Sequence, residues 1–184
     1  MSIRFIATIV ALGLGLSGCA SLTPQQCMNG NWAEIGARDG AAGRGADYIN
    51  AHRDACSELG IVPDPAAWLA GRQAGLARYC TPENAYINGR NGSRLEPVCT
   101  PAQRISMSRA YDWGLQYFAL QTDINEANAE IARIRAVILN ELSHPDLTPE
   151  EADRLASLEF RIRRLQSDIR MDELRQRRYA QLPF

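Results

Sequence analysis

Five cysteines carry the covalent chemistry available to this 184-residue chain, and the surroundings of the first one set it apart. Cys19 closes the sequence Leu16-Ser17-Gly18-Cys19, which follows a short basic start and an apolar run. Such a start is typical of a secretory signal, and the run is too short to remain as a membrane-spanning helix. The last four residues match the bacterial lipobox, in which the cysteine sulfur is bonded to a diacylglyceryl group. We therefore predict that residues 1–18 are a cleaved signal peptide and that Cys19 is lipidated.

The predicted lipid determines where the mature protein is expected. Several acyl chains such as palmitate, at roughly 0.8 kcal/mol per buried methylene, exceed what stable membrane anchoring requires. In envelopes with two membranes, an Asp directly after the lipidated cysteine commonly marks retention at the inner membrane, and this chain has Ala20 there. We expect a protein that is attached to the outer membrane by its lipid and faces the periplasm without a spanning helix.

The other four cysteines are an even number in an oxidising compartment, which predicts two structural disulfides. They are Cys27, Cys56, Cys80 and Cys99. A zinc site needs close pairs such as C-x2-C, which these spacings do not contain, so we predict no metal and no other cofactor. The sequence alone leaves the pairing open. We favour the local solution, Cys27 with Cys56 and Cys80 with Cys99, in which the shorter loop alone would remove roughly 3 kcal/mol of unfolded-state freedom.

Residue patterns typical of catalysis are scarce. The sequence contains no nucleophile elbow, no zinc signature and no Lys-Ser/Thr of a phosphate loop. His52 is assigned to a surface or helix-capping position, and His144, which precedes Pro145, is assigned to a turn. Paired acids such as Asp39 and Asp47 are assigned to caps and solvated helix faces. We therefore predict no catalytic residue and no enzymatic activity.

Composition excludes several classes of protein. With 46% hydrophobic and 22% charged residues, the chain is neither disordered throughout nor collagen-like. The formal net charge of -1 argues against a dedicated nucleic-acid binder. All 20 cationic residues are arginine, which we attribute to genomic base composition rather than to phosphate recognition.

Thr-Pro pairs mark helix starts along the chain. Thr23, Thr100 and Thr148 each precede a proline and stand three residues before Gln or Glu, which is the pattern of a capping box with a preset first turn. Asn88-Gly89 and Asn91-Gly92 are turn dipeptides, so they predict a loop over residues 81–99. We predict helices over residues 32–42, 46–59, 65–79, 101–142 and 149–180, and no strand.

Between residues 24 and 118, aromatic residues precede glycines at helical spacing. The aromatic residues are Trp32, Trp68, Tyr86 and Tyr111. Gly at three- and four-residue spacing lets another backbone or a ring approach a helix closely, at a cost of about 1 kcal/mol per Gly relative to Ala. Two interpretations remain open: tight helix packing in which the rings fill the gaps, and an aromatic groove that binds a glycan or a peptide.

Three motifs in this part of the chain occur in a fixed order. They are Trp32-x3-Gly36-x2-Asp39-Gly40, Tyr79-Cys80-Thr81-Pro82-Glu83-Asn84 and Tyr86-x2-Gly89-x2-Gly92. In this order they resemble a family of bacterial lipoproteins known only as a domain of unknown function, over about residues 27–118. Members of that family usually continue into a charged helical tail, as this chain does. The resemblance implies a secreted, lipid-anchored, cysteine-containing protein, and it implies no known activity, fold or catalytic residue.

From residue 119 onward the pattern changes to that of a coiled-coil seam. Apolar residues recur at three- and four-residue spacing from Leu120 to Leu142 and again from Leu155 to Ile169. The short connection over residues 143–147 predicts that the two helices fold back as an antiparallel hairpin within one chain. The alternative is a seam shared between two chains, which would make a dimer. Past Ile169 the seam falters at Asp172, so we expect the last turns to splay or fray.

The predicted fold is therefore all-α, with a small disulfide-closed helical head followed by a long antiparallel coiled-coil hairpin. Its parts are the signal peptide (1–18), a lipidated tether (19–23), the head (24–118) and the hairpin (119–184). Such a protein fits a structural or partner-binding role, with the membrane as a partner through the lipid and another envelope protein as a second partner. The alternative is a periplasmic module whose Gly/aromatic head binds a glycan, a peptidoglycan fragment or a peptide. We expect no nucleic-acid partner, and the oligomeric state stays open.

Overall fold

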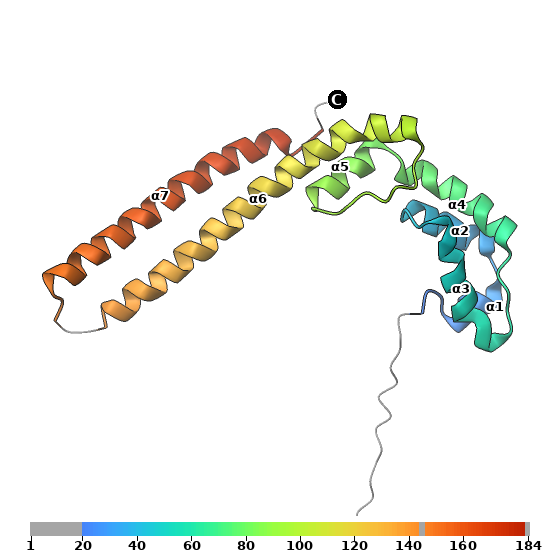
Figure 1. Cartoon of the computed structure of the whole chain (residues 1–184), viewed down its shortest axis with the longest axis horizontal. Helices are drawn as coiled ribbons and strands as arrows, with labels where there is room; N and C mark the ends of the chain where they lie inside the picture. Colours follow the sequence, from blue (N-terminus) through green and yellow to red (C-terminus); the bar gives the residue numbers. More distant parts are fainter. Residues whose placement is uncertain (1–19, 144–145, 183–184) are drawn as a thin grey trace, which may run out of the picture.

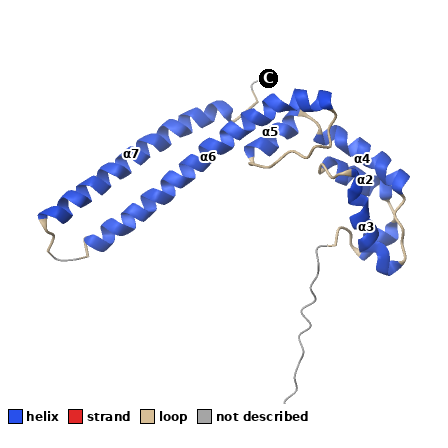
Figure 2. Ribbon diagram, in the orientation of Figure 1, coloured by secondary structure: helices blue, strands red, loops and turns tan. Residues whose placement is uncertain are grey.

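The computed structural model describes residues 20–143 and 146–182. The predicted signal peptide, Cys19 and His144 lie outside the described residues. All the regular secondary structure that the described residues form is helical, which confirms the predicted all-α class (Figure 2). A head of shorter helices lies at one end of the molecule, and a long arm of two helices extends from it (Figure 1).

The first unit of the head contains four α-helices. They are α1 (Pro24–Asn29), α2 (Trp32–Ala41), α3 (Ile49–Cys56) and α4 (Pro65–Tyr79), with 3-10 turns over Ala46–Tyr48 and Ser57–Leu59. The single helix expected over residues 46–59 is therefore divided into three pieces. A disulfide joins Cys27 in α1 to Cys56 at the end of α3, with a Cα–Cα distance of 5.6 Å. Beside this disulfide the apolar core of the unit contains Leu22, Trp32, Ile35, Ile49 and Trp68.

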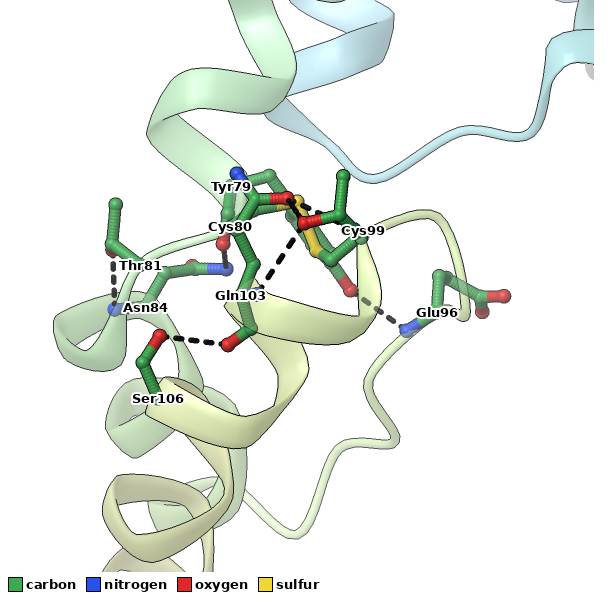
Figure 3. The surroundings of a disulfide bond; sticks show 9 residues. Tyr79, Cys80, Thr81, Asn84, Glu96, Cys99, Gln103 and Ser106 are labelled. Atoms are coloured by element: carbon green, nitrogen blue, oxygen red, sulfur yellow. Dashed lines mark hydrogen bonds between the residues drawn. A yellow bond between two sulfur atoms is a disulfide. The ribbon is translucent and has the colours of Figure 1, made fainter.

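The second unit contains α5 (Pro82–Arg90) and the first part of α6 (Pro101–Glu141). A disulfide joins Cys80, just before α5, to Cys99, just before α6 (Figure 3). Together with the disulfide of the first unit, it confirms the predicted local pairing of the four cysteines. The two disulfides have equivalent positions. One joins the segments that precede α2 and α4, and the other joins the segments that precede α5 and α6.

The prediction of a loop over residues 81–99 is wrong for α5. Thr81 caps this helix, because its side chain accepts a hydrogen bond from the backbone N–H of Asn84 at 3.2 Å, and the proline at the next position presets the first turn. Gly89 makes no turn, because it lies where α5 packs against α6. The chain reverses at Gly92, whose φ of 66° suits glycine.

Glycines allow the paired helices of each unit to touch through their backbones. The glycines between α2 and α4 are Gly36, Gly40, Gly71 and Gly75, and those between α5 and α6 are Gly89 and Gly114. A Cβ atom added at any of them would overlap a backbone carbonyl oxygen of the facing helix. This geometry fits the tight-packing interpretation of the glycine pattern.

The two units repeat one arrangement. In each unit, the later helix of the packed pair (α4 or α6) has a glycine at the crossing and an aromatic residue four positions after it. The ring of this aromatic residue covers a glycine of positive φ. These residues are Gly75, Tyr79 and Gly43 in the first unit and Gly114, Phe118 and Gly92 in the second. The head is therefore a pair of related helix crossings rather than one bundle.

The arm is the antiparallel hairpin that the sequence predicts, formed within one chain by the rest of α6 and by α7 (Pro149–Tyr179). The register places Glu141 opposite Arg154 at 3.2 Å, Glu130 opposite Arg161 at 2.8 Å, and Gln121 opposite Gln176 at 3.0 Å. The buried residues of the seam are Ile124, Ile131, Ile134 and Leu155. Leu142 does not join them and is 54% exposed, because α6 ends at Glu141. The expected boundary between residues 118 and 119 falls inside α6, so head and arm share one helix.

Candidate functional site

The four aromatic residues predicted to line a groove do not come together. Trp32 and Trp68 are buried in the core of the first unit, whereas Tyr86 is buried in the core of the second and Tyr111 packs against that core. The prediction of one aromatic groove is therefore wrong. The physical reason is that the glycine faces beside these rings are already occupied by the backbone of the facing helix.

A buried polar cluster lies in the first unit, centred on His52. This residue is only 1% exposed, so its assignment to the surface is wrong. Its Nε2 atom lies 2.7 Å from Oδ2 of Asp39, and its Nδ1 atom lies 2.9 Å from Oγ of Ser21. Trp68 also donates its indole N–H to Oδ2 of Asp39 at 2.8 Å. Asp39, assigned from the sequence to a solvated face, instead joins α2, α3 and α4.

The hydrogen-bond partners assign one tautomer to the neutral His52 ring. The Asp39 carboxylate accepts hydrogen bonds only, so Nε2 of His52 carries a proton and donates it. In the neutral ring Nδ1 then accepts the hydroxyl proton of Ser21. The order Ser–His–Asp is also found in enzymes that activate a serine nucleophile.

The surroundings of Ser21 favour a structural role for this order. Ser21 precedes Leu22, which is buried in the core of the first unit, and Thr23, which caps α1 in a complete capping box. The hydrogen bond to His52 therefore fastens the segment before α1 to α3. Of the predicted tether, residues 21–23 are bound to the head.

A second site binds the C-terminal end of the chain. The Tyr86 hydroxyl donates to the carbonyl oxygen of residue 179 at 2.7 Å, and Arg90 donates to that of residue 180 at 3.2 Å. Trp113 donates its indole N–H to the carbonyl oxygen of residue 181 at 2.9 Å. Three side chains of α5 and α6 thus bind three successive carbonyl groups. We call Tyr86, Arg90 and Trp113 the tail clamp.

Ring and charge contacts reinforce the tail clamp. The Tyr179 and Trp113 rings pack with their centroids 4.5 Å apart, and Leu182 packs against the core of the second unit. The Arg90 guanidinium lies 4.1 Å from the centre of the Tyr117 ring. The Tyr117 side chain is also the main cause that raises the pKa of Arg90 above its ordinary value. The expectation that the last turns of α7 splay or fray is therefore wrong.

The tail clamp was not predicted from the sequence because the residues that it joins are far apart along the chain. Tyr86 was singled out for its ring, but its bond to residue 179 uses the hydroxyl. Trp113 and Arg90 stand in helices whose local pattern predicts nothing about the last residues of the chain. The predicted role of Tyr86 in binding was therefore correct only in that this residue makes a contact, and the sequence did not identify the C-terminal residues as what it contacts.

A hollow of about 250 Å³ lies beside α6 in the second unit. It is lined mainly by apolar side chains, among them Leu95, Pro97, Met107 and Tyr111, and its charged members are Glu96, Arg104 and Asp112. Tyr111 thus reaches a cavity, although the other three predicted rings do not share it. This hollow is a place where a small apolar group could bind.

Two further findings concern the described residues. They contain no group of His, Cys, Asp and Glu side chains arranged to hold a metal ion. Among the helices they form, none is both long and apolar enough to span a bilayer.

Comparison with known proteins finds a match for the head. Residues 31–116 match the model of a family described as "Protein of unknown function (DUF2799)". The matched segment begins at the N-cap residue of α2 and ends within α6. Searches of curated proteins and of solved structures give no match. The head is thus similar to an uncharacterised family over residues 31–116, and the matched segment ends before the arm.

Proposed function

We propose that this protein is a lipid-anchored envelope protein that binds another envelope protein through its arm and catalyses no reaction. In this proposal Cys19 carries the lipid, which holds the protein at the outer membrane on its periplasmic side. The observation that carries the partner-binding role is a row of three exposed apolar side chains on one side of α7, which we call the α7 stripe.

Three large apolar side chains are exposed on α7: Phe160, Met171 and Leu174. At 3.6 residues per turn they fall within about 60° of one another around the helix. Seam residues such as Leu158 and Ile162 fall on the opposite side of α7, which faces α6. Because the seam is satisfied within the chain, this second stripe is free to pack against a helix or apolar surface of a partner.

The way the arm is attached supports a role in holding this stripe in a fixed position. Met107, Ala110 and Gly114 are the buried residues of α6 in the head, and Ile124 is the first buried residue of the same helix in the arm. The helix continues from one region to the other, and the tail clamp fastens the far end of α7 to the head. With both helices of the arm attached, the stripe has a defined position relative to the head.

Photo-crosslinking in cells tests the proposal. A photoreactive residue at Met171 should capture one partner protein, because this position lies on the stripe. The matched control is Asp168, which is also exposed on α7 but lies about 60° from Met171 and about 80° from Phe160 around the helix. Capture that is strong at position 171, weak at 168 and abolished by the change Phe160→Glu is the expected result. Equal capture at 171 and 168, or none at either, would contradict the proposed interface.

Membrane fractionation tests the anchor separately. Wild-type protein should sediment with the outer membrane on a density gradient, and Cys19→Ala should release it from that membrane. Recovery of the wild type with the inner membrane would overturn the proposed location, and an unchanged position of Cys19→Ala would overturn lipidation.

The hollow beside α6 supports a second candidate function, the binding of an apolar group of a cell-wall fragment or peptide by the head. Sedimentation with purified sacculi tests it, with Tyr111→Ala as the informative variant because this side chain lines the hollow. If the wild type sediments with the sacculi and Tyr111→Ala does not, the result favours the hollow in the head over the arm as the binding surface.

A further inference from the structure

The folded head begins almost directly after the predicted lipid attachment site. Leu22 is buried in the core of the first unit, and Ser21 is hydrogen-bonded to the buried His52 at 2.9 Å. Ser21 is therefore the first residue held by the head, two positions after Cys19. Two residues of fully extended chain span at most about 7 Å.

We infer that the end of the first unit around α1 and the C-terminal end of α3 lies directly on the surface of the bilayer that holds the lipid. This inference rests on the lipidation of Cys19 in the proposed function. A lipidated cysteine sits at the bilayer surface, so Ser21 is held within about 7 Å of that surface. A chain this short leaves the head no room to move away from the membrane.

The surface near Ser21 has the chemistry for such contact. His52 lies one helical turn before Cys56, whose disulfide brings α1 to the same place with a Cα–Cα distance of 5.6 Å. Met28 directly follows Cys27, and Leu59 follows Cys56 by three residues, so both lie near this cross-link. Both side chains are exposed, and so is Val62 in the next loop.

Charge indicates how this surface meets the membrane. The exposed ionisable residues near the end of α3 and in the following loop are Arg53, Asp54, Glu58 and Asp64, which are mostly acidic. Attraction to anionic headgroups is therefore not the cause of the contact. The contact is instead made by the apolar side chains at the boundary of headgroups and acyl chains, and it is imposed by the short connection to the lipid.

The position of this surface also has a consequence for the arm. α1 and α3 lie at the end of the molecule opposite the tip of the hairpin (Figure 1). If this end rests on the bilayer, the exposed stripe of α7 is presented at a distance from the membrane that is set by the head.

The test uses the lipidated full-length protein in phosphatidylethanolamine/phosphatidylglycerol vesicles. A single added cysteine carries an environment-sensitive fluorophore, at Val62→Cys in one sample and at Ile105→Cys in the other. The two positions are matched in exposure, 74% and 76%, but Ile105 lies at the start of α6 in the second unit. Fluorescence at position 62 should shift to the blue, rise several-fold on reconstitution and be quenched by lipids labelled in the acyl chain. Position 105 should show none of these changes.

The failure of the inference can be told apart from the failure of the anchor by flotation of the same vesicles. Protein that does not float, like Cys19→Ala, would refute lipidation and the proposed anchor. Protein that floats with equal signals at positions 62 and 105 would refute the bilayer contact alone. A flexible Gly-Ser segment inserted between Ala20 and Ser21 should keep flotation and lower the signal at 62. An unchanged signal after insertion would show that the short connection does not impose the contact.

Discussion

The change Gly75→Ala tests whether the backbone contact between α2 and α4 holds the first unit together. An added Cβ at this position would overlap the carbonyl oxygen of Ala37 and would lie 2.7 Å from the backbone nitrogen of Ala41. Both neighbours are helix backbone, which cannot rotate away as a flexible side chain can. The two helices must therefore move apart.

The expected loss of stability follows from two opposing effects. Overpacking of a well-packed contact costs typically about 1–3 kcal/mol, and a clash with backbone belongs at the upper end of that range. Replacing Gly by Ala inside a helix stabilises the helix by about 1 kcal/mol. The net loss should be about 2 kcal/mol, which lowers the midpoint of thermal unfolding by roughly 10 °C for a unit of this size.

Urea unfolding with the disulfides intact measures this loss, because Trp68 is fully buried beside the crossing and its fluorescence reports the first unit. Two variants serve as controls. Ala70→Gly, at an exposed position of the same helix, should cost about 1 kcal/mol from helix propensity alone. Gly60→Ala has no atom within 4 Å of the added Cβ and should lose only about 1 kcal/mol, from its φ of 66°. A Gly75→Ala protein as stable as the wild type, or more stable, would refute the argument from the helix crossing.

Three further changes have defined outcomes. Replacing Cys80 and Cys99 by Ser should lower the free energy of unfolding by about 3 kcal/mol in urea titration, and an unchanged midpoint would contradict the role of this cross-link. Removal of residues 180–184 deletes two tail-clamp hydrogen bonds and should lower the local stability of the last turns of α7 by about 2 kcal/mol. Hydrogen exchange should therefore become faster in these turns and stay unchanged in α2 and α4, which serve as the control. The double variant Ile134→Cys and Leu158→Cys should form a disulfide within one chain on oxidation. If this pair and neighbouring pairs crosslink exclusively between chains, the hairpin within one chain is refuted and the protein is a dimer.

Helix starts were predictable because the signal is local. Thr23, Thr100 and Thr148 each form the complete capping box that the sequence indicates, and each helix begins at the following proline. At Thr81 the pattern is incomplete, because Asn84 stands where the other three starts have Gln or Glu, and the two Asn-Gly dipeptides that follow predicted a loop. Gly89 has a helical role there, which only the packing of α5 on α6 reveals.

Contacts between distant residues account for what the sequence did not reveal. His52 was assigned to a surface or helix-capping position because the residues near it in the sequence form no catalytic pattern, yet its bonding partners stand 31 and 13 positions away. The tail clamp joins residues about 70 to 90 positions apart, as in Trp113 with Gln181 and Arg90 with Ala180. Neither pairing has a repeat or a spacing that would show it in a single sequence.

The repeat within the head explains where the arm comes from. In the first unit, α4 ends at Tyr79, the residue whose ring covers Gly43. In the second unit, α6 reaches the equivalent ring, Phe118 over Gly92, and continues as the first helix of the arm. The arm is therefore an extension of one helix of the second crossing, and Gly114 fixes how α6 is rotated in the head. Since a helix transmits rotation along its length, a change at this crossing should turn the α7 stripe away from the partner that we propose, without touching the stripe itself.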